Sequence, residues 1–218
     1  MQPTTILVNE KMEIIDGQGR LGAFRKLNLP VIYEIKEGIG IDECISMNIK
    51  MENWNIYDYI DSYAAQGVED YVQLTSLDDE ESTMTLMEVA MCMSDDSWSR
   101  NVDRPLREGK YKFDDNDTNR GCLNFIKSTV PYLDKIQGGG GHGQYVPVLI
   151  GLYKLDLIDD THMQNSIECY HSTMHSAATI DAALGEIQNV YNYNSRKKKR
   201  FRDAYLDAME EKGARYKN

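Results

Sequence analysis

A glycine-flanked arginine near the start of the chain is the clearest candidate for phosphate chemistry. Gly17, Gln18, Gly19 and Arg20 follow a β-branched run and precede an apolar pattern with helical spacing. Glycine lets a backbone approach a ligand closely, and a helix start presents unpaired N–H groups and the positive end of the helix dipole. The guanidinium of Arg20 matches phosphate in shape and charge. The junction predicts a phosphate-binding turn, and a Gly-x-Gly turn that only reverses the chain is the alternative.

A dense basic cluster near the C-terminus is the second candidate, for contact with nucleic-acid phosphates. The chain has a formal net charge of −11, which argues against a protein that binds nucleic acid over its whole surface. Phe201, Tyr205 and Met209 recur at helical spacing, so we expect an amphipathic helix over residues 196–212 with its charges outward. A solvated basic face that pairs with the acidic body is the alternative. The candidate contact residues are Arg196, Lys197, Lys198, Lys199, Arg200 and Arg202.

Histidines and glycines elsewhere form weaker patterns. His171 and His175 are four residues apart, which would place them on one helix face, as in transition-metal sites. Packing or surface roles are the default, because Ser172 stands where zinc proteases carry a glutamate. The glycine-rich run 138–143 lacks the Gly-Lys-Ser/Thr ending of a P-loop, so we interpret it as an interhelical connection. No metal ligands are assigned from the sequence.

The elements that must position the phosphate turn alternate between strands and helices. A polar turn at residues 9–11 separates two β-branched stretches and predicts a hairpin. Asn28 is typical of a helix C-terminus, and Pro30 forbids continuation of the helix. The expected strands are residues 5–8, 12–16 and 31–35, and the expected helices are residues 21–27 and 41–50.

From Trp54 onward the spacing of apolar residues is helical almost throughout. Asn55 caps a helix that Gly67 ends, and the polar run 78–82 is the preferred boundary between two lobes. Residues 95–117 are polar and turn-rich. The remaining expected helices are residues 68–74, 83–93, 119–136, 144–155, 160–176, 179–193 and 196–212.

With its elements in place, the first lobe resembles the ParB/sulfiredoxin superfamily. The resemblance is closest to the ParB-like domain proteins of phages and mobile elements, and it covers about residues 4–74. Residues 15–21 match the family's turn, and the block 47–51 falls where partition proteins carry Glu-Asn-x-x-Arg. The run 53–60 is similar to the helix that follows in the phage proteins.

The resemblance implies a nucleotide-phosphate site at the turn. Gly17 and Gly19 would shape the loop, Gln18 and Arg20 would contact phosphate, and Asn48 would approach a phosphate or its Mg²⁺. The implied ligand is a nucleoside di- or triphosphate with Mg²⁺. The implied site residues are Asp16, Gly17, Gln18, Gly19, Arg20, Asn48 and Lys50.

The departures from the family pattern weaken catalysis more than binding. Met47 replaces an acidic residue that helps to hold metal, and Met51 replaces a phosphate-binding arginine. Lys50 compensates in part as a point charge. Gln18 stands where sulfiredoxins carry their catalytic cysteine, so that chemistry is absent. Binding is therefore better supported than hydrolysis.

These observations predict an α+β protein, in which a small ParB/sulfiredoxin-like α/β lobe at residues 1–77 precedes a mainly α-helical lobe at 78–218. The second lobe ends in the basic C-terminal helix. Members of the family carry a strand and a helix before the hairpin, whereas this chain starts almost at the hairpin. An N-terminal truncation, or a cover supplied by the helical lobe or a second copy, is therefore expected.

The predicted function is that of a ParB-like, nucleotide-binding, DNA-associated protein of a phage or mobile element, and NTPase activity is left open. The alternatives are a nuclease or small-molecule phosphotransferase on the same fold, or a non-catalytic interaction module. Four scattered cysteines and the lack of a signal peptide or membrane-spanning run predict a cytoplasmic protein with reduced thiols. A homo-oligomer is a further expectation.

Overall fold

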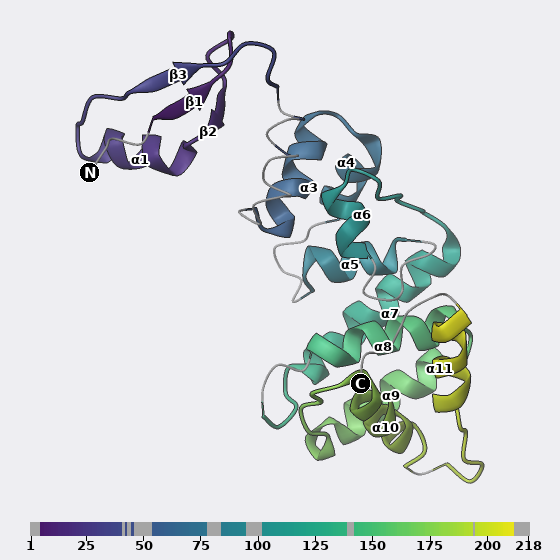
Figure 1. Ribbon diagram of the computed structural model, residues 1–218. Helices are drawn as coiled ribbons and strands as arrows, with labels where there is room; N and C mark the ends of the chain where they lie inside the picture. The colour runs from purple at the N-terminus through teal and green to yellow at the C-terminus, as the bar shows by residue number, and fades with distance from the viewer. Residues whose placement is uncertain are drawn as a thin grey trace. The chain divides into compact units, whose positions relative to one another are not determined.

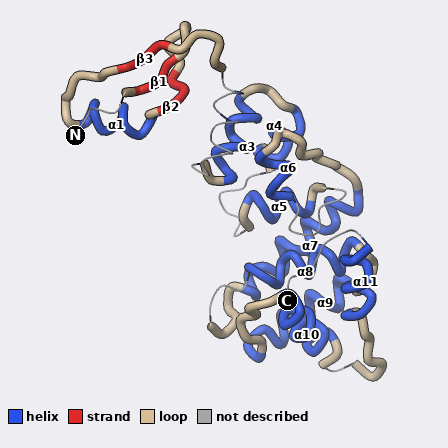
Figure 2. Tube along the Cα trace, viewed as in Figure 1, coloured by secondary structure: helices blue, strands red, loops and turns tan. Residues whose placement is uncertain are grey.

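The protein is described by a computed structural model that places residues 5–40, 42, 45, 54–77, 84–94, 102–138, 142–193 and 195–211. The chain divides into two compact units, Met1–Tyr59 and Ile60–Asn218. Within the residues described, the sheet belongs to the first unit and the second is helical (Figures 1 and 2). The predicted α+β class is confirmed. The predicted lobe boundary after residue 77 adjoins residues 78–83, which lie outside the described residues.

The first unit begins with the predicted hairpin, formed by β1 (Ile6–Val8) and β2 (Ile14–Asp16). Asn9 closes the turn, because its side-chain oxygen accepts hydrogen bonds from the backbone N–H groups of Lys11 (3.0 Å) and Glu13 (2.9 Å). An asparagine that bonds the backbone ahead of it stabilises a turn in this way. Asn9 is buried, whereas Glu10, Lys11 and Met12 at the tip of the turn are exposed.

The helix α1 (Gln18–Lys26) connects β2 to β3 (Tyr33–Ile35). Asn28 adopts a left-handed backbone (φ 51°), and the N–H of Leu29 reaches the carbonyl of Phe24 at 2.9 Å, which is a Schellman ending. The predicted stop at Asn28 is confirmed. The strand β3 pairs in parallel with β1, so the sheet order is β2-β1-β3. The predicted helix over residues 41–50 lies outside the described residues, apart from Asp42 and Ile45.

Few apolar side chains of the sheet and of α1 are buried. Ile6, Val8 and Ile15 are buried on the sheet, whereas α1 has no buried residue and every residue of β3 is exposed. Hydrophobic burial scales with the apolar area removed from water. The helix α1 and the strand β3 therefore contribute little hydrophobic burial to this unit.

The helix α3 (Ile56–Ala65) contains the division between the units. Asn55 caps it as predicted, since its side-chain oxygen accepts from the N–H groups of Tyr57 (2.8 Å) and Asp58 (3.2 Å). Gly67 ends it with a left-handed backbone (φ 79°), a conformation that glycine adopts without steric cost. The short helix α4 (Glu69–Thr75) follows.

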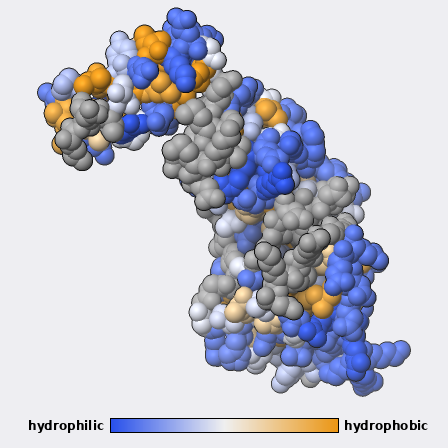
Figure 3. All heavy atoms as spheres, in the orientation of Figure 1, coloured by the Kyte–Doolittle hydropathy of each residue, from blue (hydrophilic) through white to orange (hydrophobic). Residues whose placement is uncertain are grey.

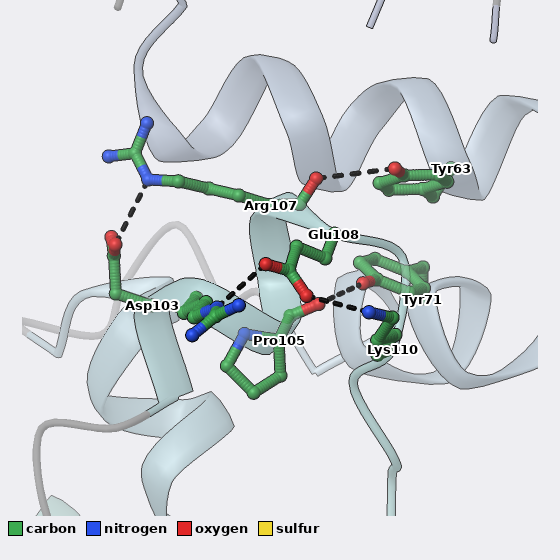
Figure 4. Close-up of polar contacts among 8 residues, drawn as sticks. Tyr63, Tyr71, Asp103, Pro105, Arg107, Glu108 and Lys110 are labelled. Atoms are coloured by element: carbon green, nitrogen blue, oxygen red, sulfur yellow. Dashed lines mark hydrogen bonds and ion pairs between the residues drawn. The ribbon is translucent and has the colours of Figure 1, made fainter. Parts of the chain in front are cut away.

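The helix α6 (Asp103–Arg107) lies in the stretch that the sequence indicated as turns. Two tyrosines fix it from other helices: Tyr63 donates a hydrogen bond to the carbonyl of Arg107 (3.2 Å) and Tyr71 to that of Pro105 (3.2 Å), as Figure 4 shows. The hydroxyl of Tyr71 also donates to the carbonyl of Leu106 (3.0 Å). Burial raises the pKa of the Tyr71 hydroxyl, which therefore stays a neutral donor. Contacts between distant segments stabilise this helix, and local periodicity does not show them.

The main core of the second unit lies where α7 packs on α8 and α9, and α10 packs on the same two helices. Leu149, Ile150 and Ile187 are fully buried there. Met91 and Met93 fill the core beside α5, as predicted from the methionine-rich sequence. The further elements described in the second unit are α5 (Leu86–Cys92), α7 (Asp117–Leu133), α8 (His142–Lys154), α9 (Asp160–Tyr170), η2 (His171–Thr173), α10 (Ile180–Tyr191) and α11 (Arg202–Glu211).

The prediction that one helix covers residues 196–212 is wrong at its start. The helix α11 begins at Arg202, and residues 195–201 form a non-helical loop with bends at Arg196 and Lys197. The reason is tertiary: side chains at the end of α10 bind the backbone of the loop, as described for the site below. Among the placed residues, no helix has both the length and the apolar character needed to cross a membrane.

Candidate phosphate-binding sites

The N-terminus of α1 presents backbone N–H groups without a side-chain cap. Gly17 occupies the N-cap position in a left-handed conformation (φ 99°), and no acidic residue lies in the first turn of the helix. The dipole of the helix therefore favours an anion at this end. This backbone arrangement agrees with the predicted turn.

Arg20 is engaged within the fold. Its Nη2 donates to Asp16 Oδ2 at 2.7 Å, and its Nη1 donates to the backbone carbonyl of Thr5 at 3.0 Å. The guanidinium crosses Gly17, where a Cβ would lie 3.2 Å from Arg20 Nε and 3.2 Å from Ile6 Cγ1. Gly17 is thus required by its backbone angle and by this close approach. Arg20 ties the turn to the start of β1, and a phosphate would have to compete with Asp16 for it.

The other predicted ligands of this turn are only partly placed. Gln18 and Gly19 are exposed, and a Cβ at Gly19 would meet no atom within 4 Å, so space does not require glycine there. Asn48 and Lys50 lie outside the described residues. The structure brings together Asp16, Gly17 and Arg20, and it leaves the second half of the predicted site undescribed.

The basic cluster lies on a loop that Asn192 fastens to the end of α10. The Asn192 side chain accepts from the N–H of Lys199 (2.7 Å) and donates to the carbonyl of the same residue (2.8 Å). Its Nδ2 also donates to the carbonyl of Gln188 (2.8 Å). One buried amide therefore fixes both the helix end and the loop backbone.

A second anchor holds the far end of the loop. Phe201 is only 1% exposed, and its ring meets that of Tyr191 edge to face, with centroids 5.7 Å apart. The side-chain oxygen of Gln188 accepts from the N–H of Phe201 at 3.1 Å. The loop backbone is therefore held at Lys199 and at Phe201. Sequence periodicity detected Phe201 as an apolar position but gave no signal for the two anchoring amides.

The six predicted nucleic-acid contacts divide into two groups. Arg202 pairs with Asp181 (Nε to Oδ1, 2.8 Å), and Lys198 donates through its ammonium to the carbonyl of Asn192. The other four side chains are exposed and form no ion pair among the residues that the structure describes. They are Arg196, Lys197, Lys199 and Arg200.

The two histidines of the predicted helix face do not lie on one helix. The helix α9 ends at Tyr170, so His171 opens the 3-10 helix η2 and His175 lies beyond it. The expectation that both share one helix face is wrong, because the helix ends before either residue. In the placed parts of the chain, no group of three His, Cys, Asp or Glu side chains is arranged to hold a metal ion. Residues 139–141 of the glycine run lie outside the described residues.

A cavity of about 490 Å³ lies beside the end of α8, and no sequence pattern predicted it. Lys154 at its wall donates to the carbonyl of Met91 (3.2 Å) and to that of Ser94. Asp159 caps α9 by accepting from the N–H of His162 (2.7 Å). Lys154 and Asp159, two of the four charged residues that line this cavity, thus already bind backbone groups of the fold.

Searches against protein-family models, curated proteins and solved structures find no match to this chain. The resemblance to ParB-like proteins stays a sequence-based prediction.

Proposed function

We propose that this protein associates with nucleic acid through the basic loop, residues 196–200. The observation that carries the proposal is that Arg196, Lys197, Lys199 and Arg200 are exposed, without an ion pair to any described residue, on a loop that Asn192 and Phe201 hold in place. Cations that are already positioned bind phosphates at a smaller entropic cost than cations on a free tail.

The charge of the rest of the chain supports a local contact. A net charge of −11 repels a phosphate backbone, so association depends on the one segment where positive charge is concentrated. Each phosphate neutralised contributes about −0.9 to the slope of log K against log salt on duplex DNA. Four free cations predict a slope of about −4.

Fluorescence anisotropy with a labelled DNA duplex, at several salt concentrations, tests this proposal. Lys197→Glu with Lys199→Glu is expected to weaken binding at least ~10-fold and to reduce the salt slope by about 2. The matched control is Lys11→Glu with Lys26→Glu, two exposed lysines of the first unit with the same change in net charge. Equal losses in both double variants, or no binding by the native chain, would contradict a specific role for the loop.

A second candidate function is nucleotide binding at the N-terminus of α1. The specific observation is the uncapped helix start behind a left-handed Gly17. A di- or triphosphate, with Mg²⁺, would take the place of Asp16 beside Arg20. This function and a DNA-associated role are compatible, and together they form the ParB-like proposal.

The two charged partners of the turn make a sharp test for nucleotide binding. Calorimetric titration with ATP, CTP, GTP and UTP, each with and without Mg²⁺, measures affinity, and released phosphate in the same samples reports NTPase activity. Asp16→Asn should raise the affinity, because it removes a competing anion, and Arg20→Gln should lower it. Variants that change affinity in the same direction would reject the exchange of Asp16 for phosphate.

A nuclease, a phosphotransferase and a purely non-catalytic interaction module remain the alternatives to this proposal. Metal-dependent cleavage of plasmid DNA by the native chain, lost in Arg20→Gln, would favour the nuclease.

A further inference from the structure

The first unit leaves part of its apolar sheet surface open at one edge. Register places Tyr33 beside Ile6 and Ile35 beside Val8, so all four side chains share one face of the sheet. Ile6 and Val8 are 1% and 4% exposed, whereas Tyr33 and Ile35 are 49% and 52% exposed. Figure 3 shows apolar side chains gathered on the drawn surface of this unit. The apolar face therefore continues to the edge without a cover.

The backbone at this edge has hydrogen-bonding groups to offer. The carbonyl of Ile32 accepts from Ile6, and the N–H of Lys36 donates to Val8, each at 2.9 Å. The backbone N–H and C=O groups of even-numbered residues in this strand thus point toward β1. The N–H and C=O groups of Tyr33 and Ile35 therefore point to the open side of the sheet. Within the described part of the chain, β3 pairs with β1 alone. Such an edge is a template for another strand.

The residues of this edge are complementary to themselves. In an antiparallel pair of two β3 strands centred on Ile35, the outward backbone groups of Ile35 meet those of the partner's Ile35. The same register places Glu34 opposite the partner's Lys36, and Lys36 opposite the partner's Glu34. A register centred on Glu34 would instead oppose two glutamates. Opposite charges across strands stabilise a pair, and like charges destabilise it.

We propose that β3 is the docking strand for a second copy of this chain, paired antiparallel about a two-fold axis at Ile35. Two ion pairs select the register, and Tyr33 and Ile35 of both copies extend the apolar face across the joint. A second copy fits this edge better than an unrelated strand, because the charge pattern satisfies itself under two-fold symmetry. Two short edge strands bury little surface between them, so the dimer is weak and concentration-dependent. The inference is independent of nucleotide and nucleic-acid binding.

Sedimentation velocity of the full chain, without nucleic acid and over a wide concentration range, measures the dimer. Glu34→Lys and Lys36→Glu should each weaken association at least ~10-fold, because each opposes like charges twice. The swapped double variant, Glu34→Lys with Lys36→Glu, should restore it. An equimolar mixture of the two single variants should also dimerise, since each then faces the opposite charge.

The two restorations separate a docking contact from a folding defect, which neither a swap nor mixing would repair. A native chain that stays monomeric at every concentration would overturn the proposal. A dimer that is indifferent to all these substitutions would do the same, because it would form through another surface. As a control, Arg25→Glu changes an exposed charge on α1 and should leave association unchanged.

Discussion

The two arginine-bearing segments of this protein differ in what their cations already bind. At the start of α1, Arg20 contacts Asp16 and the carbonyl of Thr5, so its charge is used to hold a turn. On the loop after α10, none of the five basic side chains has an acidic partner among the described residues, although Lys198 donates to the carbonyl of Asn192, and Asn192 also holds the loop backbone. Whether a basic side chain can bind a ligand therefore depends more on the hydrogen-bond acceptors near it than on how clear the sequence motif is.

The helix ends explain part of this difference. Arg20 lies in the first turn of α1, where a positive charge is unfavourable, and Asp16 offsets it. The basic loop lies beyond the C-terminal end of α10, where positive charge is favourable. An acidic partner is thus needed at the first site but not at the second.

The largest expected effect comes from removing the aromatic anchor of the loop. Phe201→Ala should lower the free energy of unfolding by about 3–5 kcal/mol, because a buried ring is lost from the contact with Tyr191. Chemical denaturation measures this change. Tyr193→Ala, at a ring that is 58% exposed, is the control and should change stability little. Equal effects in both variants would mean that Phe201 is not an anchor.

A smaller effect is expected at Asn192. Asn192→Ala leaves backbone groups of the loop without partners and should cost about 1–3 kcal/mol in unfolding free energy. It should also weaken DNA binding although no charge is changed, because the cations lose their fixed positions. Asn189→Ala, at an exposed position of the same helix, is the matched control. Unchanged DNA affinity in Asn192→Ala would show that the loop needs no preorganisation.

At the α1 turn the expected effect on stability is smaller again. Arg20→Gln should destabilise the first unit by about 1 kcal/mol, because the ion pair is partly exposed. Faster hydrogen exchange at the amides of β1 is the measurement, since Arg20 binds the carbonyl just before this strand. Arg25→Gln, an exposed arginine of the same helix, should leave exchange unchanged. Equal exchange rates in the two variants would contradict the contact of Arg20 with the start of β1.

The smallest effect concerns pH at the hairpin. The pKa of the Glu10 carboxyl is below the ordinary 4.5 because the carboxylate accepts backbone hydrogen bonds. The larger effect comes from the N–H of Glu10 itself, and the next from the N–H of Gly38 (3.1 Å). A lowered pKa in the folded state adds stability above pH 4.5, and this stability is lost as the pH falls through the folded pKa. The Gly38 amide shift in NMR should therefore titrate below pH 4.5 in the native chain and stay constant in Glu10→Gln. A midpoint at or above 4.5 would contradict the contact.

Local signals predicted the elements whose ends are closed by their own residues. Asn9 at the hairpin, Asn28 at the end of α1, and Asn55 and Gly67 around α3 were all identified from the sequence, and the structure confirms each. Turn and cap chemistry acts over a few residues, so it can be read without knowledge of the fold.

Elements that depend on distant partners were missed or misplaced. The short helix α6 is held by Tyr63 and Tyr71, more than thirty residues away along the chain. The apolar period through Phe201 predicts a helix over the basic run, yet Gln188 and Asn192 bind the backbone there in a non-helical loop. Long-range hydrogen bonds do not produce a periodic pattern in the sequence.

The sequence by itself determined which segments concentrate charge, where turns and caps lie, and that the chain combines a few strands with many helices. The tertiary structure decided how those charges are used. It gave Arg20 internal acceptors, left four loop cations without an ion pair among the described residues, and exposed the edge of β3. The physical reason is that a side chain's chemistry is local, whereas its availability depends on which groups the fold brings within hydrogen-bonding distance.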